Sequence, residues 1–352
     1  MQEDENIDKE ITTQEDVVAE QEDEILPEVL LAEEEIEDFA EEQIEAEEKK
    51  ERENFPIYII GANPLAYYIG TQLQSIGEKV IILLEHQHSE SSLNTDGISI
   101  KEDRNLTQKR HRLETSFLMK YPARMVIITA YANNINTALS SVSTKQIDGA
   151  PVICFTPLKD INYLQGLLGE NLHPAYFNGY LFNSNQAISV FGRSSKIILC
   201  PPVGKIIDRD AVSIFKSTSF ELDISESSAE SFWKYFAPYA LCSIFSAAEN
   251  KKVSELLKDK ELKEYFKPLA EEMSSLAASD NVFVNEKVIM RGVYNTPANY
   301  IFPLHQAMLN GEKTEFNLLS SVINSAAHKM KLRIPHINSL LKKLYNIILE
   351  VA

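Results

Sequence analysis

The feature that most constrains the fold is a strand–helix–strand pattern over residues 55–85. Residues 55–60 (FPIYII) form a short apolar run rich in β-branched and aromatic side chains, and a glycine ends it, which predicts a buried strand followed by a turn. Residues 64–77 carry apolar side chains at helical spacing, with Pro64 suited to the first helical position. Residues 78–85 are a second apolar run. Together these segments predict a βαβ unit, in which the two strands are parallel.

The alternation of strand and helix patterns continues to about residue 202. Near-continuous apolar strands are typical of a parallel sheet that is covered on both faces. The last three strand patterns follow one another closely, with Gly, Asn and Ser turns between them, so we expect those strands to be antiparallel. The pattern predicts a helix at 132–149 and strands at 125–131, 151–157, 175–182, 187–192 and 196–202.

Beyond Asp223 the strand patterns stop. The remaining segments have apolar residues at i, i+3 and i+4, which is typical of amphipathic helices packed together. We therefore predict a Rossmann-like domain at 55–222 and a helical domain at 225–350, so the fold class is α/β followed by all-helical. The predicted helices span 225–248, 251–279, 297–310, 315–330 and 336–350.

The first 53 residues have a different composition from the rest. Up to Asn54 the chain has 24 Asp and Glu against 4 Lys and Arg, whereas the remainder has 28 acids and 30 bases. So few apolar groups cannot offset the backbone ordering cost of about 1–2 kcal/mol per residue. We expect a disordered or partly helical acidic arm, or alternatively a docking helix for a protein partner. The charge balance disfavours nucleic-acid and membrane binding.

The cysteines and histidines indicate neither disulfides nor a metal. Cys154, Cys200 and Cys242 lie far apart, which fits a reducing compartment, and we expect Cys242 to be a buried filler. His86 and His88 form an H-x-H pair with no third ligand nearby, so we predict no metal site. No apolar run approaches 18 residues and no signal segment is evident, so we expect a soluble, cytoplasmic protein.

Three segments resemble the ketopantoate reductases (2-dehydropantoate 2-reductases). IYIIGANPLAYYIGTQLQSIGEKVIILLE (57–85) resembles their opening, and FWKYF (232–236) resembles the Trp-then-Lys segment that opens their helical domain. GEKTEFNLLSSVINSAAHKMKLRIPHINSLLKKLY (311–345) resembles their C-terminal signature. The resemblance covers about residues 55–350. It implies a Rossmann domain followed by a helical domain like that of 6-phosphogluconate dehydrogenase.

The resemblance also implies an activity, the reduction of a 2-oxo acid, ketopantoate, by NADPH. In that family a lysine at the start of the helical domain is the general acid, and a glutamate in a Thr-Glu-Ile segment binds the substrate. These positions fall on Lys234 and Glu315. Both residue types suit the chemistry, because an ammonium can protonate the alkoxide that hydride addition forms and a carboxylate can hold a hydroxyl.

Other family positions have changed. The asparagines expected four and eight residues after the lysine fall on Pro238 and Cys242, and the serine before the glutamate falls near Pro303. The lysine after the fourth strand falls on Thr129, and the asparagine after the next strand falls on Pro157. These residues cannot supply the same hydrogen bonds, so catalysis through the family mechanism is put in doubt.

The candidate cofactor turn departs from the G-x-G-x-x-G/A pattern at one critical place. Asn63 replaces the second glycine, where the backbone must approach the pyrophosphate, and Pro64 removes an N–H from the helix start. Glu85, at the end of the second strand, suits the ribose of NAD(H) and opposes the 2′-phosphate of the NADP(H) that the resemblance implies. The alternative is a turn that keeps the fold and binds no cofactor. The turn consists of Gly61, Ala62, Asn63, Pro64, Leu65 and Ala66.

Two functions remain open from the sequence. One is an NAD(P)H-dependent reductase of a 2-oxo acid, with Lys234 as general acid and Glu315 as substrate anchor. The other is a lapsed family member that acts as a binding or scaffold protein, with the acidic arm as its interaction element. If both Lys234 and Glu315 face the end of the first strand, the enzyme is favoured.

Overall fold

The computed structural model describes residues 53–84, 97–102, 109–130, 135–155, 161–184, 187–202, 204–309 and 313–351. Residues 52–352 form one compact unit. The acidic arm up to residue 52, Glu85, the pair His86 and His88, and Pro157 lie outside the described residues, so the interpretations given above for them stay predictions.

The described strands form a ten-stranded mixed sheet in the order β4-β3-β9-β8-β7-β6-β1-β2-β5, with β10 paired to β9. Its centre is parallel, since β1 pairs with β2 and β6, and β7 joins β6 to β8. The long strands β8 and β9 are antiparallel. The strands are β1 (Ile57–Ile60), β2 (Val80–Leu83), β3 (Ile98–Glu102), β4 (Lys109–His111), β5 (Glu114–Ser116), β6 (Met125–Ile128), β7 (Val152–Cys154), β8 (Leu172–Ser184), β9 (Ala187–Leu199) and β10 (Glu221–Ile224).

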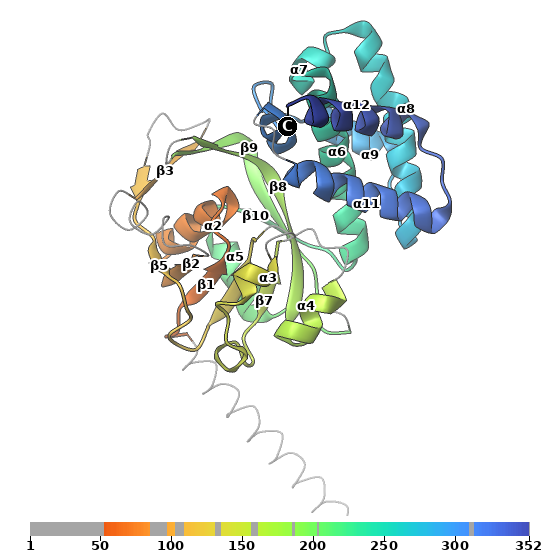
Figure 1. Cartoon of the computed structure of the whole chain (residues 1–352). Coiled ribbons are helices and arrows are strands. Elements are labelled where there is room, and N and C mark those ends of the chain that lie inside the picture. Colours follow the sequence, from red (N-terminus) through yellow and green to blue (C-terminus); the bar gives the residue numbers. More distant parts are fainter. Residues whose placement is uncertain are drawn as a thin grey trace, which may run out of the picture. The chain divides into compact units, whose positions relative to one another are not determined.

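Helices cover both faces of the central strands, as the apolar runs predict (Figure 1). Side chains alternate along a strand, so Ile57 and Ile59 of β1 pack on one face, with helices α2 (Pro64–Ser75) and α5 (Arg209–Ser217). Tyr58 and Ile60 pack on the other, with α3 (Ile135–Leu139) and α4 (Ile161–Leu168). The predicted α/β class is confirmed.

The C-terminal part is helical. After β10 ends at Ile224, the long helix α6 (Ser228–Glu249) begins, and Ser227 caps it by accepting a hydrogen bond from the Glu230 N–H. Helices α8, α9, α10 and α12 pack around α6. The remaining helices are α7 (Val253–Leu256), α8 (Lys260–Ala277), α9 (Glu286–Tyr294), α10 (Pro303–Leu309), α11 (Thr314–Met330) and α12 (Pro335–Val351).

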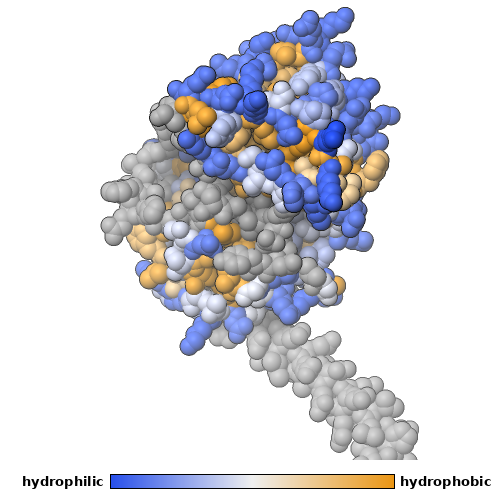
Figure 2. Space-filling view, turned by 45° about the vertical axis from the view of Figure 1, so that its right-hand side comes forward, coloured by the Kyte–Doolittle hydropathy of each residue, from blue (hydrophilic) through white to orange (hydrophobic). Residues whose placement is uncertain are grey.

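The outer surface of these helices is mostly polar on the side shown in Figure 2, with apolar residues gathered in patches between the charged ones. Their inner faces form a single apolar core around the fully buried Trp233, whose indole N–H donates to Asp280 at 2.8 Å. No helix of the described residues is long and apolar enough to cross a membrane.

The predicted helix at 132–149 is wrong in extent. Its described part holds only α3 and a 3₁₀ turn at Thr144–Gln146. The segment is rich in Ser and Thr, whose hydroxyls bond nearby carbonyls and compete with helix propagation. Ser140 Oγ donates to the Thr137 carbonyl at 2.6 Å, and Ser141 Oγ donates to the Ala138 carbonyl at 2.8 Å.

Further elements differ from the prediction, and the predicted helix at 297–310 begins only at Pro303, as α10. The two strands at 187–192 and 196–202 are one strand, β9, because both stretches pair with β8 on either side of an irregularity between Asn178 and Tyr180. The helix at 251–279 is divided in two, since Asp259 caps α8 by accepting from the Glu261 and Leu262 N–H groups. The short helix α9 was not predicted.

Candidate functional site

The turn between β1 and α2 keeps the residues that packing requires. Gly61 has φ 114°, and a β-carbon placed on it would lie 2.6 Å from the Ala130 backbone nitrogen. Only glycine fits such a close approach of two backbones. Ala66, in the first turn of α2, is completely buried. Close packing against the end of β6 therefore explains both residues without any bound cofactor.

The residue of this turn that would face a pyrophosphate is Asn63, and its side chain is already engaged. Its Nδ2 donates to the Thr129 carbonyl at 2.6 Å, and its Oδ1 accepts from the Ala66 N–H at 3.0 Å. Pro64, at the first helical position, has no N–H. Of the first three helical positions, only Leu65 therefore keeps an N–H that is not capped. This arrangement does not fit a pyrophosphate held as in a G-x-G-x-x-G turn.

Directly beside this turn lies a cavity of about 190 Å³, which we call the central cavity. It is bounded by the carboxyl ends of β1, β6 and β7, by β8, and by residues of α6, α10 and α11. Its described lining comprises Asn63, Pro64, Leu65, Thr129, Ala130, Phe155, Tyr176, Phe177, Gly179, Leu181, Tyr235, Phe236, Tyr239, Tyr300, Pro303, Glu315, Leu318, Leu319 and Val322.

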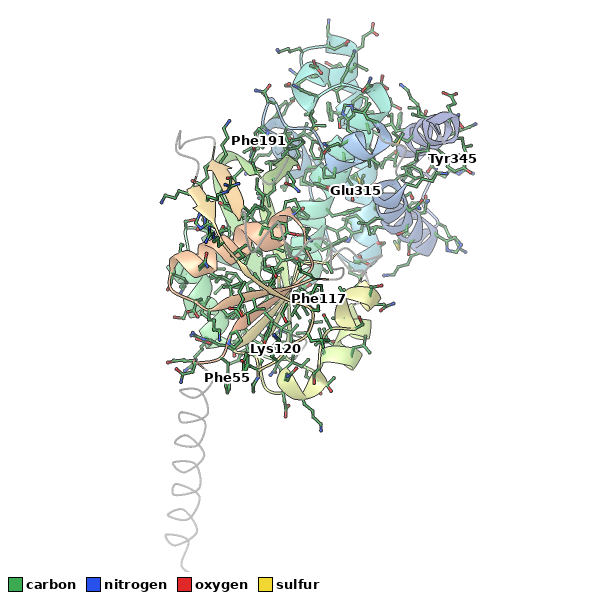
Figure 3. The ribbon with its side chains drawn as sticks, turned by 60° about the vertical axis from the view of Figure 1, so that its left-hand side comes forward. Phe55, Phe117, Lys120, Phe191, Glu315 and Tyr345 are labelled. Atoms are coloured by element: carbon green, nitrogen blue, oxygen red, sulfur yellow. The ribbon has the colours of Figure 1, made fainter. Side chains whose placement is uncertain are left out.

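Glu315 lies in this lining, at the start of α11, where the helices meet the sheet (Figure 3). Its Oε1 accepts a hydrogen bond from the Tyr239 hydroxyl at 2.9 Å. Burial raises the pKa of Glu315 above its ordinary value, and the Tyr239 hydrogen bond offsets part of that rise. Burial and the charge of Glu315 raise the pKa of Tyr239 well above 10. The structure thus brings Glu315 and the β1–α2 turn together at one cavity.

Lys234 does not join them. It is outside the cavity lining, half-exposed, and its ammonium forms an ion pair of 2.5 Å with Glu230, one helical turn earlier in α6. Among the described lining, α6 contributes Tyr235, Phe236 and Tyr239, and Tyr235 and Tyr239 lie four positions apart on one face of the helix. The family lysine, aligned to Lys234 by the sequence, thus falls one position away from the face that lines the cavity.

The other positions aligned on this helix face α9. Pro238 packs so closely on Gly292 that a β-carbon there would lie 2.5 Å from the proline ring. Cys242 lies 3.7 Å from the Thr296 hydroxyl and is buried, and burial raises its pKa to about 12, so it is an inert thiol. Positions 238 and 242 therefore pack within the protein, whereas Lys234 is half-exposed. A register one residue later places Tyr235, Tyr239 and Ser243 at the same spacing.

Several tyrosines line the cavity that no sequence pattern singled out. Tyr235 and Tyr239 stack with ring centroids 5.7 Å apart, and Tyr176 lies 6.4 Å from Tyr235. The i, i+4 pair of tyrosines beside the aligned lysine was the available signal, but nothing in the sequence shows which face of a buried helix meets a cavity. No group of three or more metal-ligating side chains occurs in the part of the chain that the structure describes.

Two protein-family models match separate stretches of this chain. Residues 57–156 match the model of ketopantoate reductase PanE/ApbA, and residues 229–347 match the model of its C-terminal part. No curated protein sequence matches the chain.

Solved structures share the fold at low sequence identity. D-mandelate dehydrogenase with NADH and anilino(oxo)acetate has a TM-score of 0.72 at 14% identity, covering 84% of this chain and 99% of that one. 2-Dehydropantoate 2-reductase from Geobacter metallireducens has a TM-score of 0.72 at 15% identity, covering 83% and 99%. A PanE/ApbA family ketopantoate reductase from Ralstonia eutropha has a TM-score of 0.69 at 14% identity, covering 84% and 99%. The two family models together span more than half of the sequence, and the chain belongs to the ketopantoate reductase PanE/ApbA family.

Proposed function

We propose that this chain is a ligand-binding member of the ketopantoate reductase family in which 2-oxo acid reduction has lapsed. The observation that carries the proposal is the face of α6 that lines the central cavity. It bears Tyr235 and Tyr239, while Lys234, the general acid that the family resemblance implies, is paired with Glu230 outside the lining. The family fold and its cleft are kept, and the group that would protonate the product is displaced from it.

The cofactor turn supports the same proposal. Both hydrogen-bonding atoms of the Asn63 amide are used inside the protein, and Pro64 withdraws a donor from the start of α2. A dinucleotide would have to displace the bond between Asn63 and Thr129 before its pyrophosphate could approach the backbone. Each net hydrogen bond of this kind contributes about 1 kcal/mol, so its loss lowers the affinity of the turn for a nicotinamide dinucleotide.

The charge of the cavity also disfavours a 2-oxo acid. Its described lining contains one carboxyl group, that of Glu315, and no Lys, Arg or His. A 2-oxo acid is an anion at neutral pH. Two like charges about 4 Å apart repel by about 1 kcal/mol in water and by several-fold more at a partly buried site.

A second candidate is an NAD(P)H-dependent 2-oxo acid reductase. Family membership and the position of Glu315 beside the β1–α2 turn favour it. In that case Glu315 would hold the substrate, and Lys234 or the hydroxyl of Tyr239 would supply the proton. Glu85, at the end of the second apolar run, would favour NADH over NADPH.

A turnover assay separates the two candidates. The full chain is mixed with NADH or NADPH and either ketopantoate or phenylglyoxylate, the 2-oxo acid that corresponds to mandelate. Lys234→Ala is compared with Lys343→Ala, a second exposed lysine with an acidic partner, Glu249. We expect no oxidation of either cofactor above the rate without protein. Turnover that Lys234→Ala abolishes and Lys343→Ala leaves intact would establish the reductase instead.

A further inference from the structure

The central cavity combines one carboxyl group with many aromatic rings. From this combination we infer that its ligand is a small organic cation that carries apolar groups, such as a quaternary or tertiary amine. The inference rests on the proposed function, because it names the ligand class of the same cavity in a protein that does not reduce 2-oxo acids there.

Aromatic rings dominate the walls of the cavity. Seven of the nineteen described lining residues are Phe or Tyr. Tyr176, Tyr235 and Tyr239 form a continuous row, with centroid separations of 6.4 Å and 5.7 Å. The faces of aromatic rings carry partial negative charge and attract cations, and groups of such rings are how proteins recognise quaternary ammonium ligands.

Glu315 stands at the end of this row. Tyr239 holds its Oε1 at 2.9 Å, whereas no hydrogen bond or ion pair from the described residues engages its Oε2. The carboxyl group is part of the cavity wall, and the described lining offers it no cationic partner. A buried carboxylate without a counter-charge is unfavourable, and a bound cation would remove that penalty.

The size and polarity of the cavity fit such a ligand. Its volume is about 190 Å³. For comparison, an apolar cavity of about 150 Å³ holds a benzene molecule. Leu181, Leu318 and Val322 add apolar surface beside the rings, which suits the methyl or methylene groups of an alkylated amine. A strongly hydrated inorganic cation would find too few oxygen ligands here.

The carboxyl group gives this inference a pH signature. Burial raises the pKa of Glu315, so part of the population is protonated above the ordinary carboxyl range, and a bound cation favours the ionised form. Among the described lining, the other titratable groups are tyrosines, namely Tyr176 on β8, Tyr235 and Tyr239 on α6, and Tyr300 before α10. Phenols ordinarily titrate near pH 10. Cation affinity should therefore rise with pH as Glu315 ionises, with release of a proton on binding.

The test is calorimetric titration of the full chain with choline and with 3,3-dimethylbutan-1-ol, its uncharged isostere. Both are measured on the wild type, on Glu315→Gln and on Tyr239→Phe, at several values between about pH 5 and pH 8. Glu315→Gln keeps the shape of the side chain and removes its charge. Tyr239→Phe keeps the ring and removes the hydrogen bond to Glu315.

We expect the wild type to prefer choline over the isostere by at least about tenfold, a difference of about 1.4 kcal/mol. This preference should grow with pH and disappear in Glu315→Gln, while Tyr239→Phe retains it. An isostere that binds as tightly as choline, a preference that survives in Glu315→Gln, or binding of neither compound would each overturn the inference. The titration with choline does not measure 2-oxo acid turnover. The proposed function is therefore tested independently, by the turnover assay described above.

Discussion

The β1–α2 turn and the cavity-facing side of α6 both occupy positions where the family resemblance places ligand contacts, yet they have diverged differently. The turn keeps Gly61 and Ala66, whose places are fixed by contacts with the end of β6 and with the core. It has lost the ligand-facing glycine, where Asn63 now closes the loop. On α6 the cavity face bears two tyrosines, whereas Pro238 packs on Gly292 of α9, Cys242 contacts Thr296, and Lys234 is half-exposed.

This contrast indicates that packing contacts hold a fold in place independently of the ligand that it binds. A residue that touches the core is retained because its replacement destabilises the protein, whereas a residue that touches only a ligand is free to change once the ligand is lost. A glycine motif therefore indicates the fold more strongly than it indicates the cofactor.

The largest expected effect concerns Gly61, the residue of the β1–α2 turn that backbone packing requires. Gly61→Ala places a β-carbon 2.6 Å from the Ala130 nitrogen at a φ of 114°, and should destabilise the chain by about 3 kcal/mol or more. Gly77→Ala is the matched control, because Gly77 has a φ of 93° with no atom within 4 Å of the added carbon. It should cost only about 1–2 kcal/mol. If urea unfolding shows that the two variants lose equal free energy of unfolding, the close approach of the Ala130 backbone is not what requires glycine at position 61.

The next prediction concerns Asn63 and Pro64, the residues of the turn that would face a bound cofactor. Replacing Asn63 by Gly and Pro64 by Ala together frees the turn and restores a donor at the start of α2. We expect this double variant to bind NADH at least about tenfold more tightly than the wild type does, as judged by calorimetry. Asn63→Ala with Pro64→Ala keeps a β-carbon in the turn and should gain less. If neither variant gains affinity, the turn is not what opposes the cofactor.

A third, smaller effect follows from the raised pKa of Glu315. A carboxyl group whose pKa is higher in the folded than in the unfolded state contributes stability that is present at low pH and is lost as pH rises through the folded pKa. Glu315→Gln should therefore be more stable than the wild type near pH 8, and this advantage should vanish below about pH 4. If thermal unfolding shows the same difference in stability between Glu315→Gln and the wild type at both pH values, the raised pKa of Glu315 is contradicted.

The smallest expected effect is that of Lys234→Ala. The ion pair of Lys234 with Glu230 is half-exposed and joins neighbouring turns of one helix, so its loss should change the free energy of unfolding by at most about 0.5 kcal/mol. Binding of choline in the central cavity should be unchanged as well. A loss of binding would place Lys234 in contact with the ligand and weaken the contrast drawn between the two faces of α6.

Strand–helix alternation and helical spacing were enough to predict the sheet with helices on both faces and the helical C-terminal part. Buried elements repeat with a fixed period, so a sequence reveals them directly. The Ser- and Thr-rich segment after β6 was mispredicted, because its hydroxyls bond local carbonyls that a regular helix would use. Residues 187–192 and 196–202 were predicted as two strands, although both stretches belong to β9 and pair with β8.

The candidate site was only partly accessible to the same reasoning. Glu315 and the β1–α2 turn were identified from their local sequence, and they do lie at one cavity. Lys234 lies one residue before Tyr235, which lines the cavity, and one residue corresponds to about 100° around a helix. A sequence pattern shows that α6 is buried on several sides, but the side that meets the cavity depends on how α9 packs on Pro238.

The central claim is that the fold is kept while the cleft has lost its fit to a nicotinamide dinucleotide. The most direct test is calorimetric titration of the full chain with NADH and NADPH. We predict weak or no binding of either, because Asn63 and Pro64 close the turn. The sequence prediction for Glu85 adds that NADPH should bind the more weakly of the two. A dissociation constant for NADPH in the low micromolar range would contradict this account and would mean that the Asn63 amide leaves the Thr129 carbonyl when the cofactor binds.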